Sequence, residues 1–453
     1  MTRLFGTDGI RGLANTDPMT PETAMTLGRA VVQILISSAA GAKPCVVVGR
    51  DTRQSGPMLE AALIAGLCSA GADVLTAGVL PTPGVAYLTR TLGAQAGVML
   101  SASHNPYMDN GIKIFSEAGT KLDDRLEDEI EARMRRPSSD TRPTGEAIGT
   151  SVLCEAPVQR YIDFLKSTFR PSMATTLRVG LDCANGAAST VAPALFAQLG
   201  AEVHVWHASP DGININDQCG SLHPEFLQHK VCEAGLDVGF AFDGDADRLI
   251  AIAHTGQILD GDYILAICAR AMLDDGLLSP RVVVSTVMAN LGLERTLQEY
   301  NITLHKAQVG DKYVMQAMHQ YDAALGGEQS GHIIFLQHHT TGDGLLTAVQ
   351  LLNAMTAQQA PLAALASILH KFPQVLVNVR LGERRDPLCL PQVQQAIQVA
   401  EDTLGLDGRV VVRLSGTEPV ARVMVEGPER AMIEPLAQRI AHVITSELAS
   451  TEG

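Results

Sequence analysis

The chain has 453 residues, which is too many for one ordinary core, so its length predicts two to four domains. Hydrophobic residues make up 46% and charged residues 18%, which excludes an intrinsically disordered chain. The formal net charge of -15 argues against nucleic acid or an anionic membrane as a partner, whereas a small phosphorylated ligand needs only a local cluster of Arg and Lys.

Neither a secretory signal nor a membrane span is predicted. The N-terminal segment "MTRLFGTDGIRG" lacks the apolar stretch of a secretory signal. The apolar run "AVVQILISSAAGA" is short and is interrupted by Gln33. From these two features we expect a soluble, cytoplasmic protein.

Short β-branched runs alternate with longer helical patterns along most of the chain, and this alternation predicts parallel or mixed sheets covered by helices. The pattern starts three times, which predicts three related α/β domains. The expected strands lie at 45–51, 73–78, 96–100, 177–182, 201–206, 237–242 and 281–286, and the expected helices include 57–72 and 189–200.

Polar stretches mark the expected joints between domains. Residues 135–151 are rich in Pro, Ser, Thr and Gly, and residues 370–387 depart from the alternation of strands and helices. The fold class is therefore α/β, with three related α/β domains that contain mixed sheets and a smaller C-terminal α+β domain. The expected domain limits are 1–150, 151–255, 256–370 and 371–453.

The segment "GVMLSASHNPYMDNGIKIFS" places a serine, Ser103, just after a strand that looks buried. Ser103 has four possible roles at this point: nucleophile, phosphate carrier, helix cap or turn residue. Lys113 follows ten residues later within the apolar run "GIKIF", and a lysine in such a run needs an anion or another special reason to be there.

The segment "FDGDADR" places Asp243, Asp245 and Asp247 at alternate positions after an apolar run. Three carboxylates this close repel one another unless a cation neutralises them, and oxygen ligands suit a hard divalent ion such as Mg2+. An EF-hand is excluded because Arg248 and His254 occupy its Gly and Glu positions. The open alternative is a solvated acidic turn; next to a metal, Arg248 could hold a phosphate.

Two further motifs suit a phosphorylated sugar. In "RLSGTEP", hydroxyl groups and backbone N–H groups could form an anion site between Arg413 and Arg422; the alternative is a capped β-turn. In "GGEQSGH", Glu328 and Ser330 alternate, so on an extended segment both would face one sugar. His332 in the same motif is a general acid/base, an orienting donor or a structural histidine.

Two Gly-rich segments near the N-terminus also carry basic residues. "FGTDGIRG" contains Arg11, and "GRDTRQSG" contains Arg50 and Arg53. Each could contact a phosphate or form a surface turn. The chain contains no P-loop, no G-x-S-x-G elbow, no H-E-x-x-H and no G-x-G-x-x-G motif. A serine, a hard-metal triad and several anion sites together favour phosphoryl transfer.

The motifs "SASHNP", "DGDADR", "GEQSGH" and "RLSGTEP", in this order and at these intervals, resemble those of the α-D-phosphohexomutase superfamily. The resemblance extends over nearly the whole chain. "FGTDGIRG", "NINDQCGSLHPE" and the Gln of "GEQSGH" are similar to the branch that acts on glucosamine phosphates. The phosphomannomutase/phosphoglucomutase branch more usually has Met in that third motif.

The resemblance implies four domains around a central active-site cleft. It implies interconversion of glucosamine 6-phosphate and glucosamine 1-phosphate, on the route to UDP-N-acetylglucosamine and the bacterial cell wall, through a phosphoserine and a bisphosphorylated sugar. It implies one Mg2+ per active site and a small phosphosugar as substrate, with no nucleic-acid or membrane partner. A homodimer is compatible with it.

The resemblance also implies a role for each motif residue. Ser103 matches the phosphoserine, and its phosphate completes a Mg2+ site formed by the three aspartates of "DGDADR". Glu328 and Ser330 match contacts to the sugar. The distal phosphate site is matched by Arg413, Ser415, Gly416, Thr417 and Arg422. The residues near the transferred phosphate are matched by Arg11, His104, Lys113, Arg248 and His332.

The last motif departs from the family pattern, which commonly has Lys where this chain has Leu414. If that lysine side chain contacts phosphate, affinity here should be weaker; if it points away from the cleft, nothing follows. Two rival functions stay open: a mutase that prefers glucose or mannose phosphates, and a non-catalytic phosphosugar-binding protein.

Overall fold

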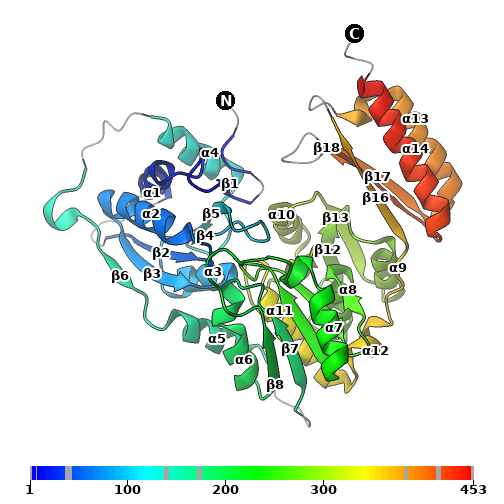
Figure 1. Ribbon diagram of the computed structural model, residues 1–453, viewed down its shortest axis with the longest axis horizontal. Helices are drawn as coiled ribbons and strands as arrows, with labels where there is room; N and C mark the ends of the chain where they lie inside the picture. Colours follow the sequence, from blue (N-terminus) through cyan, green and yellow to red (C-terminus); the bar gives the residue numbers. More distant parts are fainter. Residues whose placement is uncertain are drawn as a thin grey trace.

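The computed structural model describes residues 3–6, 8–35, 43–136, 142–170, 176–381, 386–414 and 420–449. These residues form four β-sheets with helices packed against them. In Figure 1 the first sheet (blue) and the last sheet (orange to red) lie at opposite ends, with the second and third sheets between them. The expected fold class, three α/β units with mixed sheets followed by an α+β unit, is confirmed.

The first sheet has six strands in the order β1-β5-β4-β2-β3-β6. β2 pairs parallel with β3 and β4, whereas β5 pairs antiparallel with β4 and β1. Helices cover both faces, which is why β4 is apolar and buried throughout. The elements of this unit are β1 (Ile10–Leu13), α1 (Pro21–Leu35), β2 (Cys45–Arg50), α2 (Gly56–Ser69), β3 (Asp73–Val79), α3 (Thr82–Thr91), β4 (Ala96–Leu100), β5 (Asp109–Ser116), α4 (Asp124–Met134) and β6 (Ser151–Leu153).

The second sheet repeats this plan in the order β11-β10-β9-β7-β8. Its central strands β7, β8 and β9 are parallel, and β10 turns back antiparallel to β9. The helix α5 connects the first unit to the second. The elements are α5 (Pro157–Ser167), β7 (Arg178–Asp182), α6 (Ala192–Gln198), β8 (Glu202–Trp206), α7 (Glu225–Ala234), β9 (Val238–Phe242), β10 (Leu249–Ala253) and β11 (Ile258–Leu259).

The third sheet has the order β13-β12-β14-β15 and again ends in an antiparallel pair, β14 with β15. β12 pairs parallel with both β13 and β14. The elements are α8 (Gly261–Asp274), β12 (Val282–Thr286), α9 (Leu291–Glu299), β13 (Thr303–Ala307), α10 (Asp311–Tyr321), β14 (Leu325–Gly327), β15 (Ile333–Phe335), α11 (Gly344–Gln358) and α12 (Leu362–Ala366).

The fourth sheet is antiparallel, in the order β16-β18-β17, and α13 and α14 pack on it. Its apolar residues form a core of their own, whereas one continuous core joins the first three units. The elements are β16 (Gln374–Arg380), α13 (Pro391–Leu404), β17 (Arg409–Leu414), β18 (Val420–Glu426) and α14 (Arg430–Ala449). No helix in the described ranges has the length and apolar character needed to cross a membrane.

The three α/β units place their sequence motifs at equivalent points of the topology. In each, a strand that is parallel to its neighbour on one side turns back into an antiparallel strand on the other. The connecting loops are 101–108 between β4 and β5, 243–248 between β9 and β10, and 328–332 between β14 and β15. Side chains from loops at the same edge of neighbouring sheets can therefore meet.

A buried polar contact joins α5 of the second unit to the start of α11 in the third unit. Asp343 caps this helix by accepting a hydrogen bond from the backbone N–H of Leu346, and the hydroxyl of Tyr161 donates to its other oxygen at 2.7 Å. The Asp343 side chain has no solvent exposure, and this burial raises its pKa to about 7.

Asp343→Asn tests this titration. A carboxyl group with a higher pKa in the folded chain stabilises the fold fully below its unfolded pKa, and that contribution is lost as the pH rises through the folded pKa. From about pH 4 to about pH 8 we expect the free energy of unfolding to fall further for the wild type than for Asp343→Asn. The difference between the two falls, measured by denaturation at each pH, should reach up to ~4 kcal/mol.

Asp123→Asn is the matched control, because Asp123 also caps a helix by accepting from an N–H three residues later but lies at the surface. Its pH profile should follow that of the wild type. Parallel profiles for the wild type and Asp343→Asn would contradict the assignment.

Candidate active site

Ser103 lies in the loop between β4 and β5, three residues after β4 ends at Leu100. Its side chain is buried, and its Oγ donates a hydrogen bond to Asp243 Oδ2 at 2.5 Å. Nδ1 of His104 lies 3.3 Å from the same Oγ. Burial and the nearby Arg248 and Arg11 lower the pKa of His104 to about 3, so its imidazole is neutral at physiological pH.

Asp243, Asp245 and Asp247 lie together in the loop between β9 and β10. Each offers one oxygen to a group in which all three oxygens lie within 4.8 Å of one another, and all three side chains are buried. Burial together with the charges of Asp247 and Asp245 raises the pKa of Asp243 well above its usual range. Because these side chains are buried, the alternative interpretation of the segment as a solvated acidic turn is wrong.

The aspartate group fits a hard cation. One oxygen of Asp245 and one of Asp247 are buried without a hydrogen-bond partner among the described residues. A buried carboxylate oxygen without a donor is costly, and oxygen-only ligands suit an ion such as Mg2+ or Ca2+. The group is thus able to hold a metal ion next to Ser103 Oγ.

Three cationic side chains surround this group. Nζ of the buried Lys113 lies 2.8 Å from Asp245 and 3.3 Å from Asp247. Although burial favours the neutral amine, these carboxylates and Asp8 hold the pKa of Lys113 well above its usual range. The Nε atoms of Arg11 and Arg248 are buried without a hydrogen-bond partner among the described residues, and so can donate to a ligand.

The motif "GGEQSGH" forms a tight turn between β14 and β15, not the extended segment expected from the sequence. The N–H of Gly331 donates to the carbonyl of Glu328, which closes the turn. Glu328 accepts from the backbone N–H of Gly310 at 3.0 Å, and Ser330 Oγ is buried with no partner among the described residues. Two hydrogen-bonding groups thus come together here, but through a turn and not through strand alternation.

His332 is buried between two carboxylates. Its Nδ1 lies 3.6 Å from Asp247 and its Nε2 lies 3.8 Å from Asp311, while Gly342 N donates to Nε2. Burial lowers the pKa of His332, but Asp247 and Asp311 outweigh this effect and raise it overall. The imidazole links the second unit to the third beside the three aspartates.

The C-terminal unit contributes two arginines that face each other. Arg413 on β17 pairs directly with Arg422 on β18, and like charges in this arrangement destabilise a sheet unless an anion lies between them. Burial and the charge of Arg422 lower the pKa of Arg413. Leu414, the departure from the family pattern, packs against the core of this unit. Ser415, Gly416 and Thr417 lie outside the described residues.

The sequence analysis missed a charge network that joins the first unit to the third. Lys121 forms ion pairs with both Asp8 and Asp311, and Asp8 also pairs with Arg11 and Lys113. Asp8 is part of the motif "FGTDGIRG", so its place beside Arg11 was a usable signal. Lys121 and Asp311 stand in no motif, and only the fold brings them together.

Family models of known proteins match the chain in four consecutive parts. They describe the α/β/α domains I, II and III and the C-terminal domain of phosphoglucomutase/phosphomannomutase, and they match residues 2–141, 159–256, 260–372 and 376–443. A phosphoglucomutase/phosphomannomutase family protein from Burkholderia thailandensis has a similar structure, with a TM-score of 0.80, 25% identity and coverage of 98% of this chain and 97% of that one. The chain belongs to the phosphoglucomutase/phosphomannomutase family.

Full-length relatives narrow this assignment. Phosphoglucosamine mutase of Brevibacillus brevis is 51% identical over 450 residues, covering 99% of this chain and 100% of that protein. Phosphoglucosamine mutase of Moorella thermoacetica is 52% identical over 446 residues, covering 97% and 99%. Within its family, the chain is thus a member of the phosphoglucosamine mutases, which are isomerases.

Gly244→Ala tests the contact between the serine loop and the aspartate loop. A Cβ at Gly244 would lie 2.6 Å from the carbonyl oxygen of Ser103, which is backbone and cannot move aside cheaply. We expect a loss of about 1–3 kcal/mol in stability, measured by chemical denaturation.

Gly276→Ala is the control, because a Cβ there meets open space although the φ of +70° disfavours alanine. It should cost about 1 kcal/mol from the strained backbone alone, without the added clash expected at Gly244. A Gly244→Ala variant no less stable than this control would contradict the close contact.

Proposed function

We propose that this enzyme interconverts glucosamine 6-phosphate and glucosamine 1-phosphate by phosphoryl transfer through Ser103. The observation that carries the proposal is the placement of Ser103 Oγ 2.5 Å from Asp243, at the edge of the buried aspartate group. The name of the full-length relatives, phosphoglucosamine mutase, supports the substrate. The catalytic roles that follow are part of the proposal.

In the first half-reaction, the bond between phosphorus and Ser103 Oγ breaks and a bond to a sugar hydroxyl oxygen forms. The hydroxyl proton leaves the sugar, and Oγ takes up a proton. The resulting bisphosphorylated sugar reorients within the site. In the second half-reaction the bond between its other phosphorus and the sugar oxygen breaks, a bond from that phosphorus to Oγ forms, Oγ loses its proton and the sugar oxygen gains one. Nδ1 of His104, at 3.3 Å, is the ring nitrogen beside the oxygen that gains and loses the proton.

Asp243, Asp245 and Asp247 would hold one Mg2+, with the phosphate on Ser103 as a further ligand. When bound, the ion neutralises charge that develops on the transferred phosphoryl group. Arg11 and Arg248 hold the same phosphoryl oxygens through their Nε–H groups, which have no acceptor among the described residues. Lys113 orients Asp245 and Asp247 by donating a hydrogen bond to each carboxylate.

Glu328 and Ser330 bind sugar hydroxyl groups, and Arg413 and Arg422 hold the phosphate that is not being transferred. Leu414 follows Arg413 on β17, so its side chain leaves the opposite face of the strand and packs against the core of its unit; a lysine at this position would start on the face away from Arg413 and Arg422. Ser415, Gly416 and Thr417 complete the distal site in this proposal. We also propose a cytoplasmic location, a homodimer and the domain limits expected from the sequence.

Ser103→Ala tests the proposal directly. We expect turnover of glucosamine 6-phosphate to fall by more than about a thousandfold, because no oxygen remains to carry the phosphoryl group, while thermal stability is retained. Ser367→Ala, which removes an exposed hydroxyl from the end of α12, should keep full activity.

Mass spectrometry of the peptide that contains Ser101 and Ser103 locates the phosphate in the wild type. Phosphate on Ser101, or substantial turnover by Ser103→Ala, would sink the phosphoserine mechanism. Faster turnover of glucose or mannose phosphates than of glucosamine phosphate would instead favour the rival substrate class.

Mg2+ should raise the melting temperature of the wild type, because an ion that binds only the folded chain stabilises it. Asp243→Asn should abolish this rise but still fold, since it removes one of three charges that repel one another. Asp343→Asn, which alters a buried aspartate outside the metal group, should keep the rise. An equal rise in Asp243→Asn would contradict the assigned ligands.

A further inference from the structure

Two sequence motifs find no role in the mechanism above. "GRDTRQSG" contributes Arg53, which follows β2 in the first unit, and "NINDQCGSLHPE" contributes Asn216, which lies between β8 and α7 in the second. Both side chains end on the backbone of the loop that carries Ser103. The two residues come from different units, so their meeting point is set by how those units pack.

Arg53 has no donor left for a phosphate. Its side chain has no solvent exposure, and a guanidinium group has five N–H donors. All five point to protein acceptors: Asp51 Oδ2 at 2.8 Å, and the carbonyl oxygens of Ser103 at 2.9 Å, Asn105 at 2.8 Å, Asp109 at 3.0 Å and Pro106. Neither alternative from the sequence holds for Arg53: it has no N–H left for a phosphate, and its side chain is buried and not at the surface. Its charge is balanced by the carboxylate of Asp51.

Asn216 repeats two of these contacts from the second unit. Its Nδ2 donates to the carbonyl oxygen of Ser103 at 2.9 Å and to that of Asn105 at 3.1 Å. Its own backbone N–H donates to Ala184 at 2.9 Å, which ties it to the loop after β7. Two donors from separate units thus converge on the same two carbonyl groups.

The N–H of Ser103 is held as well. It donates to Ser101 Oγ at 2.9 Å, and this hydroxyl donates to Asp51 Oδ2 at 2.6 Å. Asp51 in turn accepts from Arg53, so the hydrogen bonds run in a closed ring from the carbonyl of Ser103 back to its N–H. Both polar backbone groups of Ser103 are fixed, and only its side chain is left to face Asp243.

This arrangement holds a strained residue. Ser103 has a φ of +52°, a left-handed conformation that is strained for a residue with a side chain. Such a conformation persists only where the surrounding contacts impose it. Without them, the backbone at Ser103 would relax and move Oγ away from the aspartate group.

We propose that Arg53 and Asn216 are positioning residues that hold Ser103 in the geometry for phosphoryl transfer. Neither touches the substrate or the reacting atoms; each acts on the carbonyl groups of the serine loop. Because Asn216 belongs to the second unit, the serine is aligned by the same unit that supplies the aspartates. The inference rests on the proposed role of Ser103.

The test compares Arg53→Lys and Asn216→Ala with the wild type in steady-state turnover of glucosamine 6-phosphate. Lysine keeps the charge but has three donors on one atom and cannot reach the acceptors of Arg53 together. We expect kcat to fall about ten- to a hundredfold in Arg53→Lys and about three- to tenfold in Asn216→Ala, with KM within about twofold.

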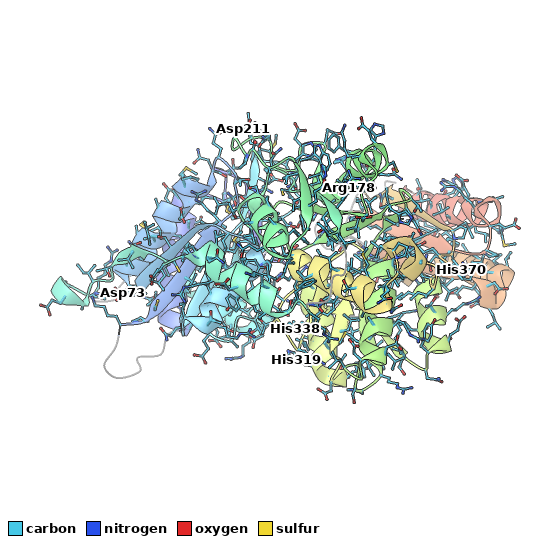
Figure 2. All side chains as sticks on the ribbon, turned by 90° about the horizontal axis from the view of Figure 1, so that it is seen from below. Asp73, Arg178, Asp211, His319, His338 and His370 are labelled. Carbon is cyan, nitrogen blue, oxygen red and sulfur yellow. The ribbon has the colours of Figure 1, made fainter. Side chains whose placement is uncertain are left out.

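Arg178→Lys is the matched control. Arg178 also donates to two backbone carbonyl groups, those of Ala234 and Gly235, but it lies at the start of β7, where its side chain is partly exposed (Figure 2). Its loss should change thermal stability slightly and leave kcat and KM unchanged. A change in kcat alone therefore separates positioning of Ser103 from a general effect on folding.

Asn216→Asp keeps the test decisive if Arg53→Lys does not fold. A carboxylate at this place would face two carbonyl oxygens, so we expect a larger loss of kcat than in Asn216→Ala. The double variant with Arg53→Lys, where it folds, should lose less than the product of the single effects, because both residues hold the same carbonyl.

Wild-type kcat in Asn216→Ala and Asn216→Asp overturns the inference, as does a rise in KM that accounts for the whole loss. Labelling of Ser103 by a bisphosphorylated sugar separates this failure from failure of the proposed function. If the wild type itself takes up no phosphate at Ser103, the proposed function fails; if it does and the variants label at the same rate, only the positioning role fails.

Discussion

The concentration of negative charge in the loop after β9 is the constraint on which the rest of the structure depends. Three carboxylates of one short loop are buried within 4.8 Å of one another. Such a group is stable only if cations or donors from elsewhere face it. The first unit supplies Lys113 and the hydroxyl of Ser103, and the third supplies His332.

This requirement explains why the first three units share one continuous core while the C-terminal unit has its own. The charges that balance the aspartates come from different units, so those units must be packed rigidly against one another. The C-terminal unit contributes the facing pair Arg413 and Arg422, and the balance of charge at the aspartates does not depend on this pair. The closed ring of hydrogen bonds around Ser103 likewise fixes its backbone carbonyl and N–H groups beside the aspartates.

Much of the fold and of the site could be predicted from the sequence. The alternation of strand and helix patterns predicted the three α/β units, because the spacing of hydrophobic residues depends on local secondary structure. "FDGDADR" predicted a group able to hold a cation, because three acids after a buried strand repel one another unless a cation faces them. Ser103 stood out because it follows an apolar run that predicts a buried strand. In each of these cases the signal lies within a few residues of the chain.

What the sequence determined by itself was thus the set of local elements and the chemistry of each loop. The tertiary structure decided the partners. Lys121 meets Asp8 and Asp311 only because two units pack together, and all five donors of Arg53 are satisfied only once its loop closes. The turn at Glu328 likewise depends on the pairing of β14 with β15. These contacts join residues far apart in the chain, and no local pattern encodes the distance between them.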